Sequence, residues 1–206
     1  MSELWRYPVK SLRGERVDVA DIREEGIAGD RIVHVRESSG RVATSRYRPG
    51  LLGLAGTLGE DGEPFVDGVL WSEPSVLERV RAVTEPQAEL VRFEGVDHGQ
   101  RFDVLPLTVL TESMARAVGY DHRRFRPNLL IADAPDDAEL HWAGYGLRVG
   151  GALIGVLEPK VAVRDDDLRS RHARARSDGA PPRRSVVRRP RRARLPGGAS
   201  GRGARR

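Results

Sequence analysis

The stretch Arg124-Phe125-Arg126-Pro127-Asn128-Leu129-Leu130-Ile131 places arginines, a proline and a carboxamide directly before an apolar run. The apolar run predicts a buried strand, and guanidinium groups bind phosphate or carboxylate through paired hydrogen bonds. The stretch therefore predicts an anion-binding cluster at the mouth of a buried strand. A loop of solvated arginines before a core strand explains these residues equally well, so the rest of the chain has to decide.

Composition excludes several classes of protein. The chain has 206 residues, of which 39% are hydrophobic and 32% charged, enough for one sizeable core or two small ones. No apolar run reaches the roughly 20 residues that span a bilayer, so we expect no membrane role. The N-terminus lacks the basic flank and apolar block of a secretory signal, which predicts a cytoplasmic location. The absence of cysteine excludes disulfides and thiolate metal sites.

Charge divides the chain into two unlike regions. Residues 161–206 carry 15 arginines and 4 aspartates, a net charge of +11, whereas residues 1–160 carry 20 basic and 26 acidic groups, a net charge of −6. The tail has no sustained period of 2 or 3.6 residues, so we expect it to be disordered. Lys10 and Lys160 are the only lysines among 35 basic residues, a bias that favours a GC-rich bacterial source.

The pattern of apolar residues before the tail predicts a mainly β fold with a few short helices, an α+β class. Thr111 and Gly119 suit the two ends of one helix, and Ser72 suits the N-terminus of another, with Pro74 in its first turn. The predicted strands are 3–9, 17–22, 31–35, 41–46, 90–93, 105–110, 129–131 and 146–156, with hairpin turns at 38–40, 59–63 and 150–151, and the predicted helices are 72–80 and 111–118.

Four islands carry a recognisable pattern, and in chain order they are residues 4–11, 29–31, 124–128, and 142–151 followed by 158–159. Together they resemble the MOSC family, named after the C-terminal domain of molybdenum cofactor sulfurase, in the subgroup with an N-terminal β-barrel domain. The first and third islands are specific for the family. The resemblance implies a β-barrel domain at 1–95, a partial MOSC domain at 96–160 whose barrel is incomplete at the C-terminus, and an arginine-rich tail at 161–206.

The resemblance also implies that the two domains hold a molybdenum cofactor, molybdopterin, between them. The lysine and serine would bind its phosphate, the arginines would bind its anionic groups, and the carboxamide would bind the pterin edge. These candidate residues are Lys10, Ser11, Arg31, Arg46, Arg126 and Asn128. Arg46 lies beside Arg48, and plain surface charge explains that pair equally well.

The subgroup includes the mitochondrial amidoxime-reducing component and bacterial reductases of N-hydroxylated compounds. The resemblance thus implies a molybdenum-dependent oxidoreductase with a small-molecule substrate and an iron–sulfur or flavin electron donor. A sulfur carrier or sulfurtransferase in cofactor maturation is the alternative from the same family, which is also described as binding pyridoxal phosphate. The five histidines have no close spacing, which argues against a histidine-built metal site, and no P-loop is present.

The metal ligand expected from the family is missing. In the family, the Glu-Pro segment leads to a cysteine whose thiolate binds molybdenum or carries sulfur, but Val163 stands at that position here. Codon degeneracy permits the family pattern, cysteine included, when the sequence after Ala162 is read one base downstream. We therefore hypothesise a frameshift near codons 158–162. We expect this chain to fold poorly beyond about residue 157 and to bind cofactor weakly or not at all.

Nucleic-acid binding through the arginine-rich tail is an alternative from a different class of protein. Its fifteen arginines would attract phosphate backbones with a strong dependence on salt. The tail has no aromatic residue for base stacking and no recognition motif. The sequence therefore argues against a nucleic-acid partner.

Overall fold

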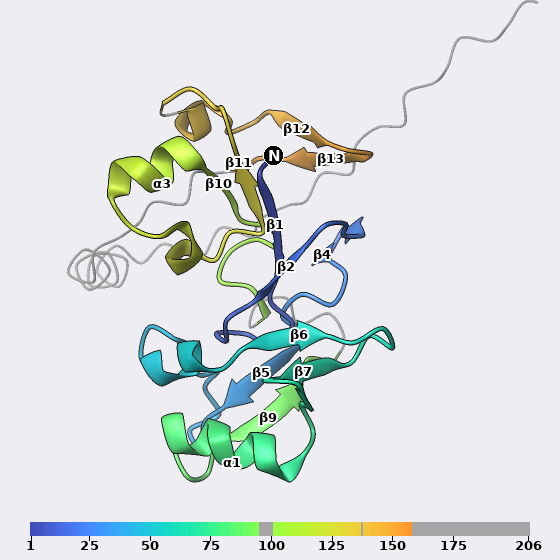
Figure 1. Ribbon diagram of the computed structural model, residues 1–206, viewed down its shortest axis with the longest axis vertical. Coiled ribbons are helices and arrows are strands. Elements are labelled where there is room, and N and C mark those ends of the chain that lie inside the picture. The colour runs from blue at the N-terminus through green and yellow to red at the C-terminus, as the bar shows by residue number, and fades with distance from the viewer. Residues whose placement is uncertain (95–100, 137, 158–206) are drawn as a thin grey trace, which may run out of the picture. The chain divides into compact units, whose positions relative to one another are not determined.

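Most of the regular secondary structure consists of short strands. The computed structural model describes residues 1–94, 101–136 and 138–157, all within one compact unit, Met1–Lys160. The predicted mainly β class with a few short helices is confirmed (Figure 1). None of the helices in the described part of the chain is both long and apolar enough to cross a membrane.

The strands are β1 Glu3–Arg6, β2 Glu15–Val17, β3 Ile22–Arg23, β4 Gly26–Ile27, β5 Val33–Arg36, β6 Gly56–Leu58, β7 Pro64–Val66, β8 Val69–Leu70, β9 Glu89–Arg92, β10 Val109–Thr111, β11 Leu129–Ile131, β12 Gly146–Val149 and β13 Ala152–Gly155. The helices are α1 Pro74–Val83 and α3 Glu112–Val118, and the 3-10 helices are η1 Pro49–Gly53, η2 His122–Phe125 and η3 Ala138–His141.

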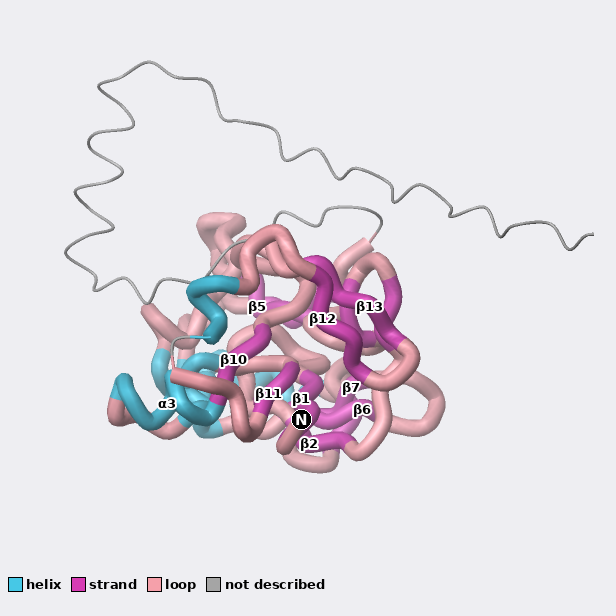
Figure 2. The backbone as a smooth tube through the Cα atoms, turned by 90° about the horizontal axis from the view of Figure 1, so that it is seen from above, coloured by secondary structure: helices cyan, strands magenta, loops and turns pink. Residues whose placement is uncertain are grey.

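A four-stranded sheet in the order β10-β11-β1-β2 positions the arginine motif. The strand predicted after that motif is confirmed as β11, whose Leu129 pairs with Leu4 of β1 on one side and with Val109 of β10 on the other. Figure 2 shows β10, β11 and β1 lying side by side. Since β11 follows Asn128 directly, the pairing brings residues 126–128 next to the first strand of the chain.

The other strands form small sheets. One sheet has the order β6-β7-β8, and three pairs are β3-β4, β5-β9 and β12-β13. Single bridges, Val9 to Val33 and Arg13 to Ala55, connect parts of the chain where a barrel would have continuous ladders. Within the described residues the sheets therefore do not close into a barrel.

Two apolar cores lie beneath these sheets. The smaller contains Leu4, Ile27, Leu129 and Ile154 and packs along the four-stranded sheet. The larger joins β5 and α1 to the residues after β1, and its members are Val9, Leu12, Val33, Val35, Ala43, Leu51, Leu54, Val66, Val76, Val80 and Ala88. The larger core fixes the backbone on both sides of Lys10 and Ser11.

The predicted return strand at 41–46 is wrong. After the turn at 38–40, Val42 makes one bridge to Arg36 and no strand follows it. The carbonyl of Thr44 accepts hydrogen bonds from the amides of both Tyr47 and Arg48, at 3.0 and 2.8 Å, so the chain turns there. Arg46 consequently lies in a turn.

Local capping chemistry predicted one helix well and the other in part. The Thr111 hydroxyl accepts a hydrogen bond from the amide of Met114 at 3.0 Å, and Gly119 ends α3 with a φ of 73°, as predicted. Pro74 is the first residue of α1, as predicted, but Ser72 does not cap that helix. Glu73 is the N-cap, and its side chain makes no capping hydrogen bond. Its backbone is extended because a proline follows it directly.

Two predicted strands differ in extent. The run at 105–110 becomes a strand only from Val109, after Pro106, which has no N–H to donate to a ladder. The run at 17–22 divides between β2 and β3. The hairpins around residues 59–63 and 150–151 and the strand near 90–93 are confirmed.

The predicted domain boundary at 95/96 falls in the segment 95–100, which lies outside the described residues. It stays a prediction, and the four-stranded sheet combines strands from both sides of it. The expectations for the tail and for the chain beyond residue 157 also lie outside the described residues.

Candidate functional site

Tyr7 lies at the centre of the candidate site, directly after β1. Its side chain is buried, and its backbone holds the turn Gly29-Asp30-Arg31 from both sides. The amide of Tyr7 donates to Oδ1 of Asp30 at 2.7 Å, and its carbonyl accepts from the amide of Arg31 at 2.7 Å. Arg31 adopts a φ of 50°, an uncommon conformation for a residue with a side chain, so this turn is held by its partners.

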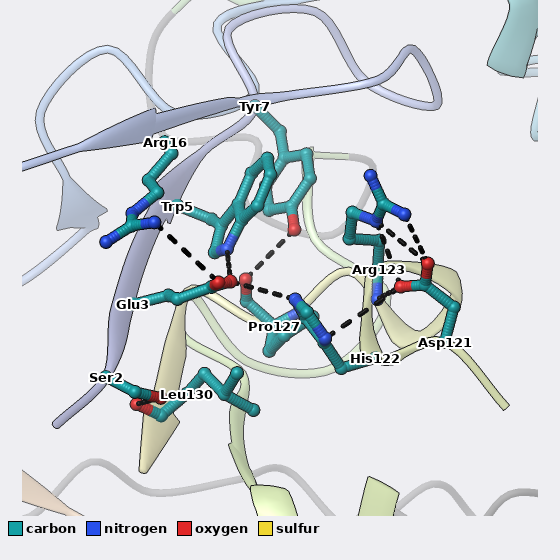
Figure 3. Close-up of polar contacts among 10 residues, drawn as sticks. All are labelled: Ser2, Glu3, Trp5, Tyr7, Arg16, Asp121, His122, Arg123, Pro127 and Leu130. Atoms are coloured by element: carbon teal, nitrogen blue, oxygen red, sulfur yellow. Dashed lines mark hydrogen bonds and ion pairs between the residues drawn. The ribbon is translucent and has the colours of Figure 1, made fainter. Parts of the chain in front are cut away.

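Two guanidinium groups lie over the ring of Tyr7. The guanidinium carbon of Arg126 is 4.2 Å from the ring centroid, and that of Arg31 is 5.2 Å away. Cations are attracted to the face of an aromatic ring, most strongly where water is excluded. Burial raises the pKa of the Tyr7 hydroxyl above its ordinary value of 10 although both arginines oppose the shift, so the hydroxyl stays protonated. It donates to the carbonyl of Pro127 at 2.9 Å (Figure 3).

Arg126 carries a buried guanidinium whose hydrogen-bond donors are only partly paired. Arg126 is the C-cap of η2, with a φ of 51°, and its Nη1 donates a hydrogen bond to the carbonyl of Leu12. Nη2 is buried and has no hydrogen-bond partner among the described residues. Burial, reinforced by the charge of Arg31, lowers the pKa of Arg126 to about 10. An anion beside Nη2 would offset both effects.

Asn128 is fully buried and joins three segments of chain. Its Oδ1 accepts from the amide of Thr108 at 3.1 Å and from Nη1 of Arg31 at 3.4 Å. Its Nδ2 donates to the carbonyl of Trp5 at 3.3 Å. In this structure the carboxamide is engaged with the chain, and its effect on the site is to orient the guanidinium of Arg31.

Lys10 and Ser11 stand in the chain between two members of the larger core, Val9 and Leu12, and both are buried. The ammonium of Lys10 is 3.4 Å from Oδ1 of Asp103. Burial lowers the pKa of Lys10, Asp103 opposes that shift, and the charges of Arg31 and Arg126 add to it. Ser11 has a φ of 73°, and its hydroxyl donates to the carbonyl of Ala43 at 3.2 Å.

The structure therefore brings together three of the four predicted cations. Lys10, Arg31 and Arg126 influence one another electrostatically, and Asn128 joins them through Arg31. Arg46 is exposed and makes no hydrogen bond or ion pair with the described residues. The structure gives no contact that joins Arg46 to the other candidates, and its proposed role stays a prediction.

Sequence reasoning missed four residues of this cluster: Tyr7, Asp30, Arg101 and Asp103. Asp30 is fully buried, and its carbonyl accepts two hydrogen bonds from Arg101, at 2.7 Å from Nη2 and 3.1 Å from Nε. Tyr7 and Asp30 belong to the first two sequence islands, so their proximity to Lys10 and Arg31 was a usable signal. Arg101 and Asp103 belong to no motif, and no local pattern indicates them.

A second polar network connects β1 to η2, the 3-10 helix that leads to Arg126. Glu3 accepts hydrogen bonds from the indole of Trp5 at 2.7 Å and from Nε2 of His122 at 2.8 Å (Figure 3). Burial opposes ionisation of Glu3, but the hydrogen bond from Trp5 and the positive charge of His122 outweigh it and lower the pKa of Glu3. The network ties β1 to η2 and so fixes the segment that leads to Arg126.

The described residues contain no group of three or more His, Cys, Asp or Glu side chains placed to hold a metal ion. A surface hollow of about 360 Å³ lies elsewhere, between Glu3, His122 and helix α3. The candidate site is thus a cationic cluster suited to an anion, with no metal ligands of its own in the part of the chain that the structure describes.

A family model matches the N-terminal part of the chain. The family model described as the MOSC N-terminal beta barrel domain matches residues 1–75. That range includes Lys10, Ser11, Arg31 and Arg46 and ends before Arg126 and Asn128. No curated protein matches the chain.

Proposed function

The chain carries a MOSC N-terminal β-barrel domain, from a family linked to molybdenum-cofactor-binding proteins, and on this premise we propose that Lys10, Arg31 and Arg126 bind the phosphate of a molybdenum cofactor. The finer activity that we propose for the ancestral protein is the reduction of N-hydroxylated compounds. The chain as it stands keeps the phosphate half of that site and lacks the metal half.

One observation carries the proposal, and it is the unsatisfied guanidinium of Arg126. A buried donor without a partner costs about 1 to 3 kcal/mol, and more when it is charged. Nη2 of Arg126 is such a donor, and the nearby charge of Arg31 increases the cost of keeping the guanidinium ionised. A phosphate oxygen beside Nη2 would satisfy the donor and neutralise the charge.

The neighbouring residues have separate roles in this proposal. Lys10 supplies a compact charge and Arg31 a second guanidinium, while Asn128 orients Arg31 through their 3.4 Å hydrogen bond. Ser11 would bind phosphate only after its hydroxyl leaves the carbonyl of Ala43. Asn128 is fully buried, and its carboxamide oxygen and one of its two N–H groups are bonded to the chain, which favours a positioning role over direct contact with a pterin.

The metal half of the site does not fit. Molybdenum in such a cofactor takes a soft thiolate ligand from the protein, and this chain has no cysteine. In a protein with that thiolate, the cofactor would supply the metal chemistry of the proposed reduction. The residues at hand can hold an anionic phosphate and exclude water around it, but they cannot complete the metal coordination. We therefore place the reductase activity in a frame-restored protein and not in this chain.

The experiment measures the pterin that co-purifies with the chain after expression in a molybdopterin-producing host. Oxidised pterin is quantified by fluorescence per mole of protein for the wild type, Arg126→Met and Arg124→Met. Arg124 is exposed, stacks on Tyr120 at 4.6 Å and matches the charge change. We expect pterin with the wild type and Arg124→Met, well below stoichiometric, and a large loss in Arg126→Met. Equal pterin in the two variants would overturn the phosphate site.

A second arm tests the activity. The gene is restored to the shifted frame after codon 162, and turnover of an N-hydroxylated compound is measured with a reduced electron donor. Turnover with bound molybdenum supports the reductase. A molybdenum-loaded protein without turnover, but able to transfer sulfur to the cofactor, would favour the sulfur-carrier alternative. Stoichiometric molybdenum in the unrestored chain would contradict the proposed loss of the metal half.

A further inference from the structure

The ammonium of Lys10 already has an anion beside it, the carboxylate of Asp103 at 3.4 Å. The two partners differ in exposure, since the Lys10 side chain is 11% exposed and that of Asp103 is 59% exposed. Lys10 is held by the hydrogen bond from its amide to the carbonyl of Val33 at 2.8 Å and by fully buried Val9. The fixed partner of this pair is therefore the cation, and the carboxylate reaches it from the solvent side.

Charge in the cluster is unbalanced in a way that gives Asp103 a distinct role. Among the described residues, the cations Lys10, Arg31, Arg101 and Arg126 outnumber the carboxylates that act on them, which are those of Asp30, Asp103 and, at Arg101, Glu25. Asp30 is fully buried, with one oxygen bonded to the amide of Tyr7 and the other to Arg31. Asp103 is exposed whereas Asp30 is fully buried, so Asp103 can move into solvent when another anion takes its place beside Lys10.

Asp103 acts on more than one of the cations. Its negative charge favours the ionised forms of both Lys10 and Arg126. These are two of the three side chains that we assign to the phosphate. A carboxylate and a phosphate oxygen compete for the same N–H donors, because both are anionic acceptors. Asp103 and a ligand phosphate therefore compete for the ammonium of Lys10.

We propose that Asp103 is an internal counter-ion of the anion site, which neutralises Lys10 when no ligand is bound and is displaced by an incoming phosphate group. This inference rests on the proposed phosphate site. It assigns Asp103 as a residue that sets the affinity of the site. A phosphate monoester carries a charge of about −1.5 to −2 at neutral pH, so it neutralises the cluster better than a single carboxylate does.

The test measures binding of inorganic phosphate to the full chain by isothermal titration calorimetry at neutral pH and fixed ionic strength. The variant Asp103→Asn removes the charge and keeps the shape. Asp21→Asn is the matched control, because Asp21 is 61% exposed, forms an ion pair with Arg23 at 2.7 Å and changes the net charge equally. Because Asp103 is open to solvent, its ion pair with Lys10 has modest strength, and we expect phosphate to bind about fivefold more tightly to Asp103→Asn.

A double-mutant cycle with Lys10→Met tests whether Asp103 acts through Lys10. In the Lys10→Met background, the gain from Asp103→Asn should shrink to less than about twofold, with the remainder due to Arg126. Asp103→Ser is the second variant, in case the asparagine rearranges the segment, and thermal unfolding of each protein verifies folding.

The outcomes separate this inference from the proposed function. Tighter binding by Asp103→Asn and Asp103→Ser than by Asp21→Asn supports the counter-ion. Phosphate binding by the wild type that is equal or stronger than binding by both Asp103 variants overturns it and leaves the phosphate site standing. No phosphate binding by the wild type or by any Asp103 variant overturns both.

Discussion

Replacing Arg126 by methionine separates a ligand-binding arginine from a structural one. Methionine keeps a long apolar side chain over Tyr7 and the same positive φ, but it removes the charge and the hydrogen bond to Leu12. Loss of that charge-assisted bond costs about 1.5 to 3 kcal/mol, and loss of the cation–π contact costs about 1 kcal/mol. Together these two losses lower the free energy of unfolding by about 2.5 to 4 kcal/mol.

Burial of the Arg126 charge lowers the free energy of unfolding, and the substitution removes that unfavourable effect. The pKa of Arg126 falls from 12.5 to about 10, and each unit corresponds to about 1.4 kcal/mol, so relief of the buried charge returns about 3 kcal/mol. The two effects nearly cancel. We expect the free energy of unfolding of the ligand-free chain to change by less than about 1.5 kcal/mol. The affinity for phosphate should fall about 30-fold, since one charge-assisted contact contributes about 2 kcal/mol.

Urea unfolding with and without phosphate measures both quantities, with Arg124→Met as the control. In the wild type and the control, phosphate should raise the unfolding free energy, because a ligand of the folded state stabilises it. In Arg126→Met this increase should be lost. A destabilisation of more than about 3 kcal/mol together with unchanged phosphate affinity would refute the reasoning, because Arg126 would then be a structural residue.

Three further predictions concern buried polar groups. Burial, together with nearby positive charges, lowers the pKa of His34 from 6.5 to about 4, so stability should be full above pH 6.5 and fall by about 3 kcal/mol as the pH drops to 4; His34→Leu should flatten that pH profile in urea unfolding. Thr111→Val should lower the unfolding free energy by about 1 to 2 kcal/mol, because it removes the cap of α3 and the 2.7 Å bond to Glu139. Asn128→Leu should lower the unfolding free energy by about 3 kcal/mol, because it leaves the amide of Thr108 and the carbonyl of Trp5 without their hydrogen-bond partner. It should also weaken phosphate binding, because Arg31 loses the bond that orients it.

Exposed residues of the same type provide controls for two of these variants. His141→Leu should leave the acid limb of the stability profile in place, and Thr57→Val should leave the unfolding free energy nearly unchanged. An acid limb that persists in His34→Leu would assign the effect to another group. Unchanged stability in Thr111→Val would mean that Glu139 and the cap contribute nothing measurable. For Asn128→Leu, full stability with lost phosphate binding would favour direct contact with the ligand over a positioning role.

Where the signal was local, the sequence predicted structure well. Thr111 and Gly119 mark the ends of α3 because a hydroxyl at the N-cap and a glycine at the end act within one turn. The prediction of a return strand at 41–46 was wrong because the amides of Tyr47 and Arg48 bond to the carbonyl of Thr44 and turn the chain there. Neither composition nor the alternation of apolar residues indicates that turn. Ser72 failed for a similar reason, since Pro74 moved the N-cap by one residue.

The residues of the candidate site likewise divide into those in local motifs and those brought together only by the tertiary fold. Lys10, Arg31 and Arg126 could be predicted because each stands in a recognisable motif. The two guanidinium groups over the ring of Tyr7, and the carboxylate of Asp103 beside Lys10, could not be predicted. Asp103 is 93 positions from Lys10 in the sequence, and the two meet only through the tertiary fold. Pairings of that kind leave no periodic pattern in either segment.

The pairing of β1 with β11 also has a consequence for how the protein is made. Ser2 bonds to Leu130, 128 positions later, and the same sheet carries Arg126 and Asn128 to the end of β1. At typical synthesis rates of about 5 to 20 residues per second, roughly 6 to 26 seconds separate the emergence of these strands from the ribosome. Until then β1 can pair only with β2, and its other edge is open to unwanted partners. The nascent chain must therefore carry Lys10 and Arg31 for that interval before Arg126 and Asn128 complete the cluster.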